Sequence, residues 1–481
     1  LFLRHHRACH QEQEYQEQVV SHRFFESLPP RFTPKSSLFL IFFDQWLTVP
    51  TLGILVWLVI DNHGKKGILP VDFMEKTNYR LLFSAPVLVA ALGYFVDIYD
   101  LLLFSIVRIS SLRSMGVSDA DMLATGEFLI RVQMTGLLVG GLIWGIMGDK
   151  RGRLSVLFGS ILLYSLANIA NGFATTVDQY ALLRFIAGIG LAGELGAGIT
   201  LVAEILPTRL RGYGTTLVAT VGLMGAVLAN IIAKNFEWQT AYFIGGGLGL
   251  MLLIARVGVF ESGVFLKIKE QEVERGNFLQ LFRSRERLIK FMGCILIGLP
   301  IWYVIGILIT FSPEFAAALA IQGTVNSGDA VMFSYIGLAA GDLSSGFISQ
   351  AVRSRKKVVS GFILITLAVV IFYLYGPIGS ATGFYMVCFA LGFGVGYWAL
   401  FVTVAAEQFG TNLRSTVATS VPNFVRGTVV PLTLLFKFFR GYLGLVTGAL
   451  LVGLLTVAIG LLALRWIDET FSRDLNFVEK D

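Results

Sequence analysis

The sequence carries little charge for its length. Only 15% of its 481 residues are Asp, Glu, Lys or Arg, whereas ordinary soluble domains contain about 25%. Hydrophobic residues make up 55% of the chain, and the mean hydropathy is +0.71. These values exclude a chain built only from ordinary soluble domains, and they indicate an integral membrane protein embedded in a lipid bilayer.

Cysteine and histidine are also scarce. Cys9, Cys294 and Cys388 are scattered and form no C-x-x-C pair, which argues against a disulfide framework or a cysteine metal site. All five histidines lie within residues 5–63, so the apolar part of the chain offers no His/Cys cluster. A phosphate-binding loop of the form G-x-x-x-x-G-K-[ST] is absent, which argues against ATP-driven pumping. We therefore expect no metal and no cofactor.

Twelve apolar runs of the length needed to cross a bilayer, roughly 20 residues, follow one another along the chain. They lie at about 81–108, 128–147, 154–173, 179–205, 214–233, 241–260, 290–313, 328–350, 358–377, 381–405, 415–439 and 441–466. The expected fold is an all-α membrane protein, with twelve helices in two pseudo-symmetric six-helix halves around a central cavity.

The spacing of these runs also predicts the domain organisation. We expect an N-terminal extension at 1–79, a first six-helix bundle at 80–260, a cytoplasmic central loop at 261–288, a second bundle at 289–467 and a cytoplasmic tail at 468–481. The extension contains another apolar run at residues 38–60, which is interrupted by Asp44 and Pro50. It is interpreted as upstream sequence outside the twelve-helix count.

The net charge of +6 is distributed as a topology signal. Basic residues occupy alternate short loops, so nucleic acid is not an expected partner, and both ends of the bundle are placed in the cytoplasm. Ala203-Glu204, Leu210-Arg211 and Thr216 recur 203 residues later as Ala406-Glu407, Leu413-Arg414 and Thr419. Such repeats are typical of transporters whose halves rock about a central site.

The loop after the second run carries a further motif, Gly145-x-x-x-Asp149-Lys150-x-Gly152-Arg153. It resembles the G-x-x-x-D-[RK]-x-G-R signature of the major facilitator superfamily. A carboxylate near a helix N-terminus, with packed glycine and flanking cations, can hold two helices in one state and release them in another. The residues predicted for this conformational latch are Gly145, Asp149, Lys150, Gly152, Arg153, Glu204, Arg211, Glu407 and Arg414. The alternative is a plain positive loop.

Other motifs narrow the resemblance, which covers about residues 80–475. The segment from Arg184 to Ala192 resembles the R-x-x-x-G-x-G-x-A pattern that is associated with proton coupling in this superfamily. Glu204 to Gly212 resembles the E-x-x-P-x-x-x-R-G loop of sugar porters and metabolite–proton symporters, and Glu261-Ser262 and Glu469-Thr470 resemble their P-E-S and P-E-T ends without the prolines. The fifth run lacks the proline-containing signature of drug–proton antiporters.

Charges inside apolar runs are expensive and therefore mark candidate sites. Asp97 and Asp100 are three residues apart, which places them on one helical face, and such a pair favours binding of a proton. Their segment resembles the D-G-[FY]-D of aromatic-acid–proton symporters, with Ile98 in place of glycine. Arg184 and Glu194 complete the predicted proton-coupling set.

Arg426 lies about midway through its run and is suited to bind a carboxylate or phosphate on a substrate. The alternative is an internal salt bridge with Asp342, Asp97 or Glu194. The predicted substrate-binding residues are Tyr94, Arg426, Asn423, Tyr303, Tyr397 and Asp342. The aromatic members could instead face lipid.

The sequence thus predicts a monomeric secondary transporter that moves a small organic acid or similar metabolite by alternating access, with proton symport. We expect it in a cell membrane, and the short outer loops favour a bacterial inner membrane. The alternatives are a sugar-type facilitator without proton coupling, a non-transporting sensor or scaffold on the same fold, and a membrane-embedded enzyme using its buried acids.

Overall fold

The computed structural model describes residues 58–60, 66–68, 79–151, 153–194, 202, 205–206, 208–261 and 278–471. The chain forms two units, Leu1–Met74 and Glu75–Asp481, which are considered separately. In the first unit, strands β1 (Leu58–Ile60) and β2 (Lys66–Ile68) pair antiparallel, with Val59 opposite Gly67. This short strand pair corrects the all-α expectation, which holds for the described residues of the second unit.

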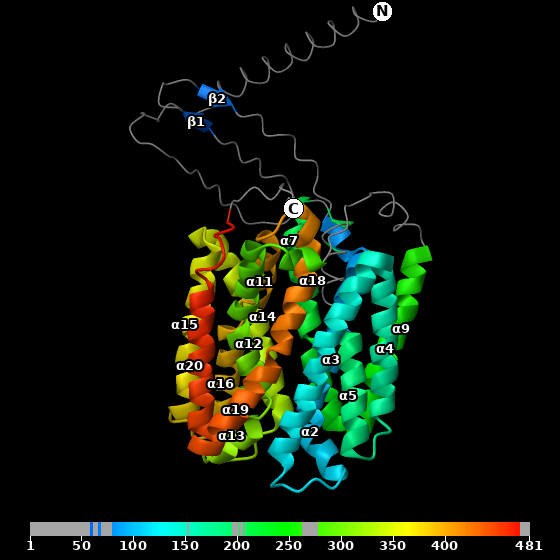
Figure 1. Cartoon of the computed structure of the whole chain (residues 1–481), viewed down its shortest axis with the longest axis vertical. Helices are drawn as coiled ribbons and strands as arrows, with labels where there is room; N and C mark the ends of the chain where they lie inside the picture. Colours follow the sequence, from blue (N-terminus) through cyan, green and yellow to red (C-terminus); the bar gives the residue numbers. More distant parts are fainter. Residues whose placement is uncertain are drawn as a thin grey trace, which may run out of the picture. The chain divides into compact units, whose positions relative to one another are not determined.

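The second unit is a bundle of helices (Figure 1). Along the chain, these helices fall into two sets, one before and one after the expected central loop at residues 261–288. The first helix set comprises η1 (Tyr79–Phe83), α2 (Ala85–Ser114), α3 (Met122–Arg151), α4 (Arg153–Asn171), α5 (Val177–Leu191), α7 (Thr208–Leu223), α8 (Gly225–Asn235) and α9 (Trp238–Glu261). The second helix set comprises η2 (Phe278–Phe282), α11 (Arg285–Ile297), α12 (Leu299–Tyr303), η3 (Val304–Ile309), α13 (Ser312–Ala318), α14 (Ser327–Val352), α15 (Arg355–Tyr375), α16 (Ala381–Gly394), α17 (Trp398–Glu407), α18 (Thr411–Gly427), α19 (Val429–Leu443) and α20 (Leu445–Ala463).

Nine helical segments of the described residues are long and apolar enough to cross a membrane. They account for nine of the twelve expected spans. The other three expected spans coincide with α4, with α5, and with α18 and α19, which are separated at Thr428. Each of these is too short or too interrupted to qualify alone, so the count of twelve remains a prediction.

Several spans are interrupted partway along their length. The span Arg285–Ile309 ends in the π-helical turn η3, α16 and α17 are separated by Val395 to Tyr397, and α18 contains Pro422. Interrupted helices leave backbone groups free of the regular ladder, which membrane proteins tolerate where the break is buried in protein or lines a cavity. Polar side chains gather beside two of these breaks.

Glycine brings helices into close contact in the same way in both sets. A Cβ atom on Gly136 or Gly188 would overlap a backbone carbonyl oxygen across the α3–α5 contact. A Cβ atom on Gly337 or Gly392 would do the same across the α14–α16 contact. Small residues allow such close packing of helices in a bilayer, where the hydrophobic effect does not drive association.

The polarity of the second unit is reversed relative to a soluble protein. Large apolar side chains such as Phe347 and Ile254 are 75% and 72% exposed, whereas Asp97 and Arg426 are fully buried. An apolar exterior suits contact with lipid, and charges in the interior of such a bundle are expected to pair with one another.

The α14–α16 contact gives a test of the packing. We expect G337A to lower the free energy of unfolding by about 1–3 kcal/mol, because the added methyl group meets the carbonyl oxygen of Phe389, which is backbone and cannot turn aside. G346A on the same helix is the control, since no described atom lies within 4 Å of its Cβ position. Thermal unfolding of both variants in detergent measures the difference, and equal melting temperatures would contradict the packing.

Candidate functional site

The centre of the site is an ion pair between the two helix sets. Arg426, the penultimate residue of α18, donates from Nη2 to Oδ2 of Asp97 on α2 at 3.2 Å, and both side chains are at most 1% exposed. The guanidinium also lies 5.9 Å from the ring centroid of Trp398. Nε and Nη1 of Arg426 and Oδ1 of Asp97 have no hydrogen-bond partner among the described residues. Two donor atoms of a buried cation are therefore free to bind another anion.

Two tyrosines also act on the central arginine. The phenol groups of Tyr94 on α2 and Tyr335 on α14 both interact electrostatically with Arg426, and both side chains are buried. Tyr94 packs against Gly222 of α7, where a Cβ atom would overlap its ring. Tyr94 was predicted from the sequence, whereas Tyr335 lies in an apolar helix and carries no charge that would have marked it.

Asp342 lies at the break between α16 and α17. Its Oδ1 accepts a hydrogen bond from the backbone N–H of Ala399 at 2.9 Å, in the first turn of α17. The close approach of α14 to this break requires two glycines, because a Cβ atom on Gly396 would overlap the backbone of Gly341. Asp342 thus caps the half-helix that begins with Trp398, the residue whose ring lies beside the central arginine.

Asp97 and Asp100 are close to different arginines. The charge of Asp100 interacts with Arg184 and with Asp97, and the side chain of Asn168 also acts on this carboxylate. Arg184 donates to the Oδ1 atom of Asn168 at 3.1 Å and lies 5.1 Å from the ring centroid of Tyr242. Asp100 therefore supplies a negative charge to the buried Arg184 without a direct hydrogen bond between the two side chains.

Glu194 forms a two-point ion pair with Arg256 of α9, in which Nη1 donates to Oε2 at 3.0 Å and Nη2 contacts Oε1. Both side chains are buried, and Gly93 of α2 leaves room for the pair because a Cβ atom there would overlap both groups. Arg256 was not predicted. It lies four residues from the expected end of its span, where a basic side chain is easily interpreted as a topology signal.

Asn423 lies one turn before Arg426 on α18. Its Nδ2 donates to the backbone carbonyl of Ala192, just after α5, at 2.7 Å and to that of Thr419 at 3.2 Å. The predicted substrate-binding residue therefore joins the two helix sets in this structure.

The hydroxyl groups of the other two predicted aromatic residues donate to backbone carbonyls. Tyr303 donates to Ala449 of α20 at 2.7 Å, and Tyr397 donates to Ile297 of α11 at 3.0 Å. Both side chains are fully buried, so neither faces lipid. Their hydroxyls join neighbouring helices of the second set.

The predicted latch in the first helix set lies largely outside the described residues. Gly152 and Glu204 are not described, and neither are the side chains of Asp149, Lys150, Arg153 and Arg211. Gly145 is described, and no described atom lies within 4 Å of its Cβ position. The packing expected of that glycine is therefore not seen among the described residues.

In the second helix set, the predicted latch residues Glu407 and Arg414 both form polar contacts. Glu407 pairs with Arg355 at 2.7 Å, and the Arg414 guanidinium donates to the carbonyl of Phe409 at 3.4 Å. Glu469 accepts from the Ser354 hydroxyl at 2.5 Å and from the Arg355 backbone at 2.9 Å. Burial opposes ionisation of Glu469, but these hydrogen bonds outweigh it and hold its pKa below the usual value.

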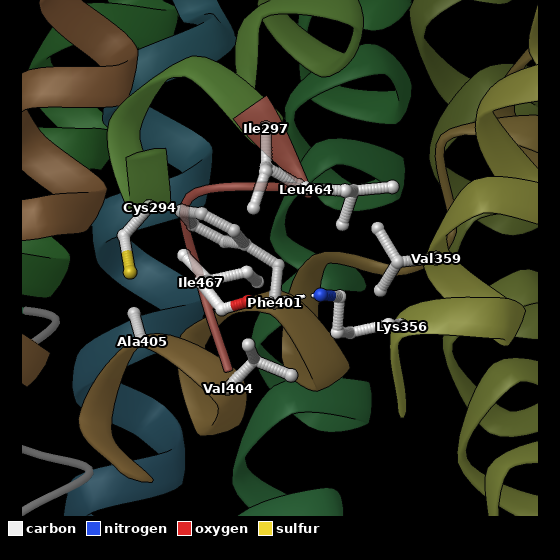
Figure 2. Close-up of a pocket in the computed structure, with 9 residues that line it drawn as sticks. All are labelled: Cys294, Ile297, Lys356, Val359, Phe401, Val404, Ala405, Leu464 and Ile467. Atoms are coloured by element: carbon white, nitrogen blue, oxygen red, sulfur yellow. Dashed lines mark hydrogen bonds between the residues drawn. The ribbon is translucent and has the colours of Figure 1, made fainter. Parts of the chain in front are cut away.

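A small pocket elsewhere in the second helix set contains none of the predicted site residues (Figure 2). Its lining is apolar apart from Lys356, and Figure 2 shows the Lys356 ammonium directed at Ile467, whose carbonyl accepts its hydrogen bond at 2.9 Å. The Lys356 ammonium is already hydrogen-bonded, and the lining includes none of the charged residues of the central site, so this pocket is separate from that site.

The Glu194–Arg256 pair gives a test of the buried electrostatics. E194L or R256M alone should lower the free energy of unfolding by about 3–5 kcal/mol, because each leaves a buried charge without its partner. The double substitution E194L/R256M should recover most of that loss, since it removes both charges. A double-mutant cycle of thermal unfolding measures the coupling, and additive losses would show that the two side chains do not pair.

Comparison with known proteins finds transporters of small molecules. The sialic acid transporter NanX of Escherichia coli (strain K12) is 26% identical over 378 residues, which cover 76% of this chain and 88% of NanX. The niacin transporter NiaP of Acinetobacter baylyi is 24% identical over 379 residues, which cover 71% and 82%. The structure of the proton:xylose symporter XylE bound to 6-bromo-6-deoxy-D-glucose matches with a TM-score of 0.60 and 16% identity, over 83% of this chain and 98% of that chain.

The family model of the Major Facilitator Superfamily matches residues 36–432. This match begins upstream of the first expected span at residue 81. The relatives are small-molecule transporters, so a membrane-embedded enzyme is set aside. The chain is a multi-pass membrane protein that belongs to the Major Facilitator Superfamily.

Proposed function

We propose that this protein is a secondary active transporter that moves a small organic acid across the membrane by alternating access, with symport of a proton. The observation that carries this proposal is the buried Asp97–Arg426 ion pair between the two helix sets. A site shared by two bodies can be exposed to either side when one body rocks against the other.

The substrate is proposed to bind through a carboxylate at Arg426. The guanidinium has two donor atoms without partners among the described residues, and a planar guanidinium matches a carboxylate with two parallel hydrogen bonds. The relatives NanX and NiaP are named for sialic acid and niacin, which both contain a carboxylate. Tyr94 and Asn423 are proposed to line the same site, with Tyr303 and Tyr397 fixing the surrounding helices.

The proton is proposed to bind at Asp97 and Asp100. While Arg426 pairs with Asp97 the carboxylate is compensated, but a substrate anion at Arg426 competes for that positive charge. A buried carboxylate that loses its partner is more stable when protonated, so anion binding and proton binding favour one another. Arg184 and the Glu194–Arg256 pair are proposed to set the charge around the two aspartates.

Asp342 is proposed to position the site rather than to bind the substrate directly. One of its carboxylate oxygens caps the start of α17 at Ala399. The first residue of α17 is Trp398, whose ring lies beside Arg426. Loss of the cap would loosen Trp398 and with it the geometry of the guanidinium.

We further propose the architecture expected from the sequence, with twelve spans in two six-helix halves and both ends of the bundle in the cytoplasm of a bacterial cell. The Glu407–Arg355 and Glu469 contacts of the second helix set support a latch at the end of the bundle that carries the basic loops. We propose a monomer whose partners are the lipid bilayer, the substrate and a proton, without nucleic acid.

The proposal predicts the behaviour of D97N. Radiolabelled nicotinate and sialic acid serve as probes in proteoliposomes with an imposed pH gradient. We expect D97N to reduce gradient-driven uptake by about tenfold or more, a change that corresponds to about 1.4 kcal/mol, because the amide cannot take up a proton. Exchange of labelled for unlabelled substrate without a gradient should persist.

E237Q removes an exposed carboxylate and is the control for loss of one negative charge. Uptake by D97N that responds to the pH gradient as strongly as uptake by the unmodified protein would contradict the proposal.

A further inference from the structure

Ion pairs that join the two helix sets gather at one end of the bundle, where α2 ends and α3 and α14 begin. We call this the α13 end, after the short helix that lies there (Figure 1). None of the residues in these pairs belongs to the central site, and none was predicted from the sequence.

The first pair joins α2 to α13. The Nη2 atom of Arg108 contacts Oε1 of Glu314 at 2.7 Å, and the Arg108 side chain is fully buried. Its guanidinium lies 5.0 Å from the ring centroid of Phe311. Gly126 of α3 leaves the room that Arg108 needs, because a Cβ atom there would crowd the Arg108 side chain.

The second pair joins α3 to α19, and the third joins α14 to α8. Glu127, fully buried on α3, pairs with Arg440 of α19 at 2.9 Å. Asp329 on α14 pairs with Lys234 of α8 at 2.5 Å and accepts a hydrogen bond from Asn230 at 3.0 Å. Each pair again takes one residue from each helix set.

These two pairs are related by the internal repeat of the chain. Glu127 and Asp329 are 202 residues apart and both lie near the start of their helices, α3 and α14. Lys234 and Lys437 are 203 residues apart, on α8 and α19, and the charge of Lys437 also acts on Glu127. Glu204 and Glu407, which define the repeat, are also 203 residues apart. In both places an acid of one half thus meets a base of the other half, although the ion pair of Glu127 is with Arg440, three residues after Lys437.

We propose that these three ion pairs form a gate that closes the α13 end in this conformation and separates each time that end opens. The inference rests on the alternating-access proposal. Ion pairs suit such a contact because the buried charges of Arg108 and Glu127 are neutralised by their partners, and each regains water when the helix sets part, which offsets much of the lost attraction.

The gate can be tested without substrate or transport. Ser105 lies one turn before Arg108, is 6% exposed, and its Oγ is 3.2 Å from Oγ1 of Thr310 in the second helix set. A membrane-impermeant cationic methanethiosulfonate reagent should label S105C slowly in the full-length protein in vesicles, and S118C, at an exposed position, quickly. Labelling of the native cysteines is measured without these changes and subtracted.

We expect E127Q/D329N to raise the labelling rate of S105C by about tenfold or more, as a shift of about 1.4 kcal/mol towards the open state would do. D119N is the matched control, since the Asp119–Arg113 pair is exposed and lies within the first helix set. The charge swap D329K/K234D should restore protection to D329K, which shows that the effect is electrostatic and that the fold is intact.

Three results would overturn the gate. They are labelling of S105C as fast as S118C in the otherwise unmodified protein, labelling unchanged by E127Q/D329N, and an increase with D119N as large as that with E127Q/D329N. Since no transport is measured, failure of the gate would leave the D97N experiment to decide the proposed function by itself.

Discussion

The Asp97–Arg426 ion pair is the contact around which the rest of the structure is arranged. It places a full positive and a full negative charge in the interior of a membrane protein, where charges are tolerated only with partners. One member comes from each helix set. Any motion between the sets must therefore either lengthen this contact or pivot about it. The Trp398 ring lies beside Arg426, the phenols of Tyr94 and Tyr335 interact electrostatically with it, and the Asp342 cap fixes the half-helix that supplies Trp398.

The other buried charges form a series around this pair. Glu194 pairs with Arg256, and the charge of Glu194 also acts on Asp97. Asp100 interacts electrostatically with both Arg184 and Asp97. A change in the charge of one member is therefore felt by the others. The α13 end contains a separate group of ion pairs between the same two helix sets, so one end is held by charge pairs while the centre holds two aspartates and an arginine with free donor atoms.

The sequence alone predicted the family and nine of the spans. It also identified Asp97, Asp100, Arg184 and Arg426 as charges inside apolar runs, because such a charge is a local signal. Pairing is not local. Arg256 near the end of its span resembles an interface residue, and Glu127, Asp329 and Arg440 resemble loop-edge charges until the helices are packed. Tyr303 and Tyr397 were chosen by residue type, and only the fold shows that their hydroxyls bind backbone carbonyls of other helices.

The central claim is that substrate anion and proton bind together at the Asp97–Arg426 pair. Infrared difference spectra of the full-length protein, recorded with and without nicotinate and with and without sialic acid, test it most directly because a protonated carboxyl group has its own carbonyl stretching band. The account predicts that binding of a carboxylate substrate produces this band and that D97N removes it. Binding of either acid with no protonated carboxyl band, or with a band unchanged in D97N, would contradict the account.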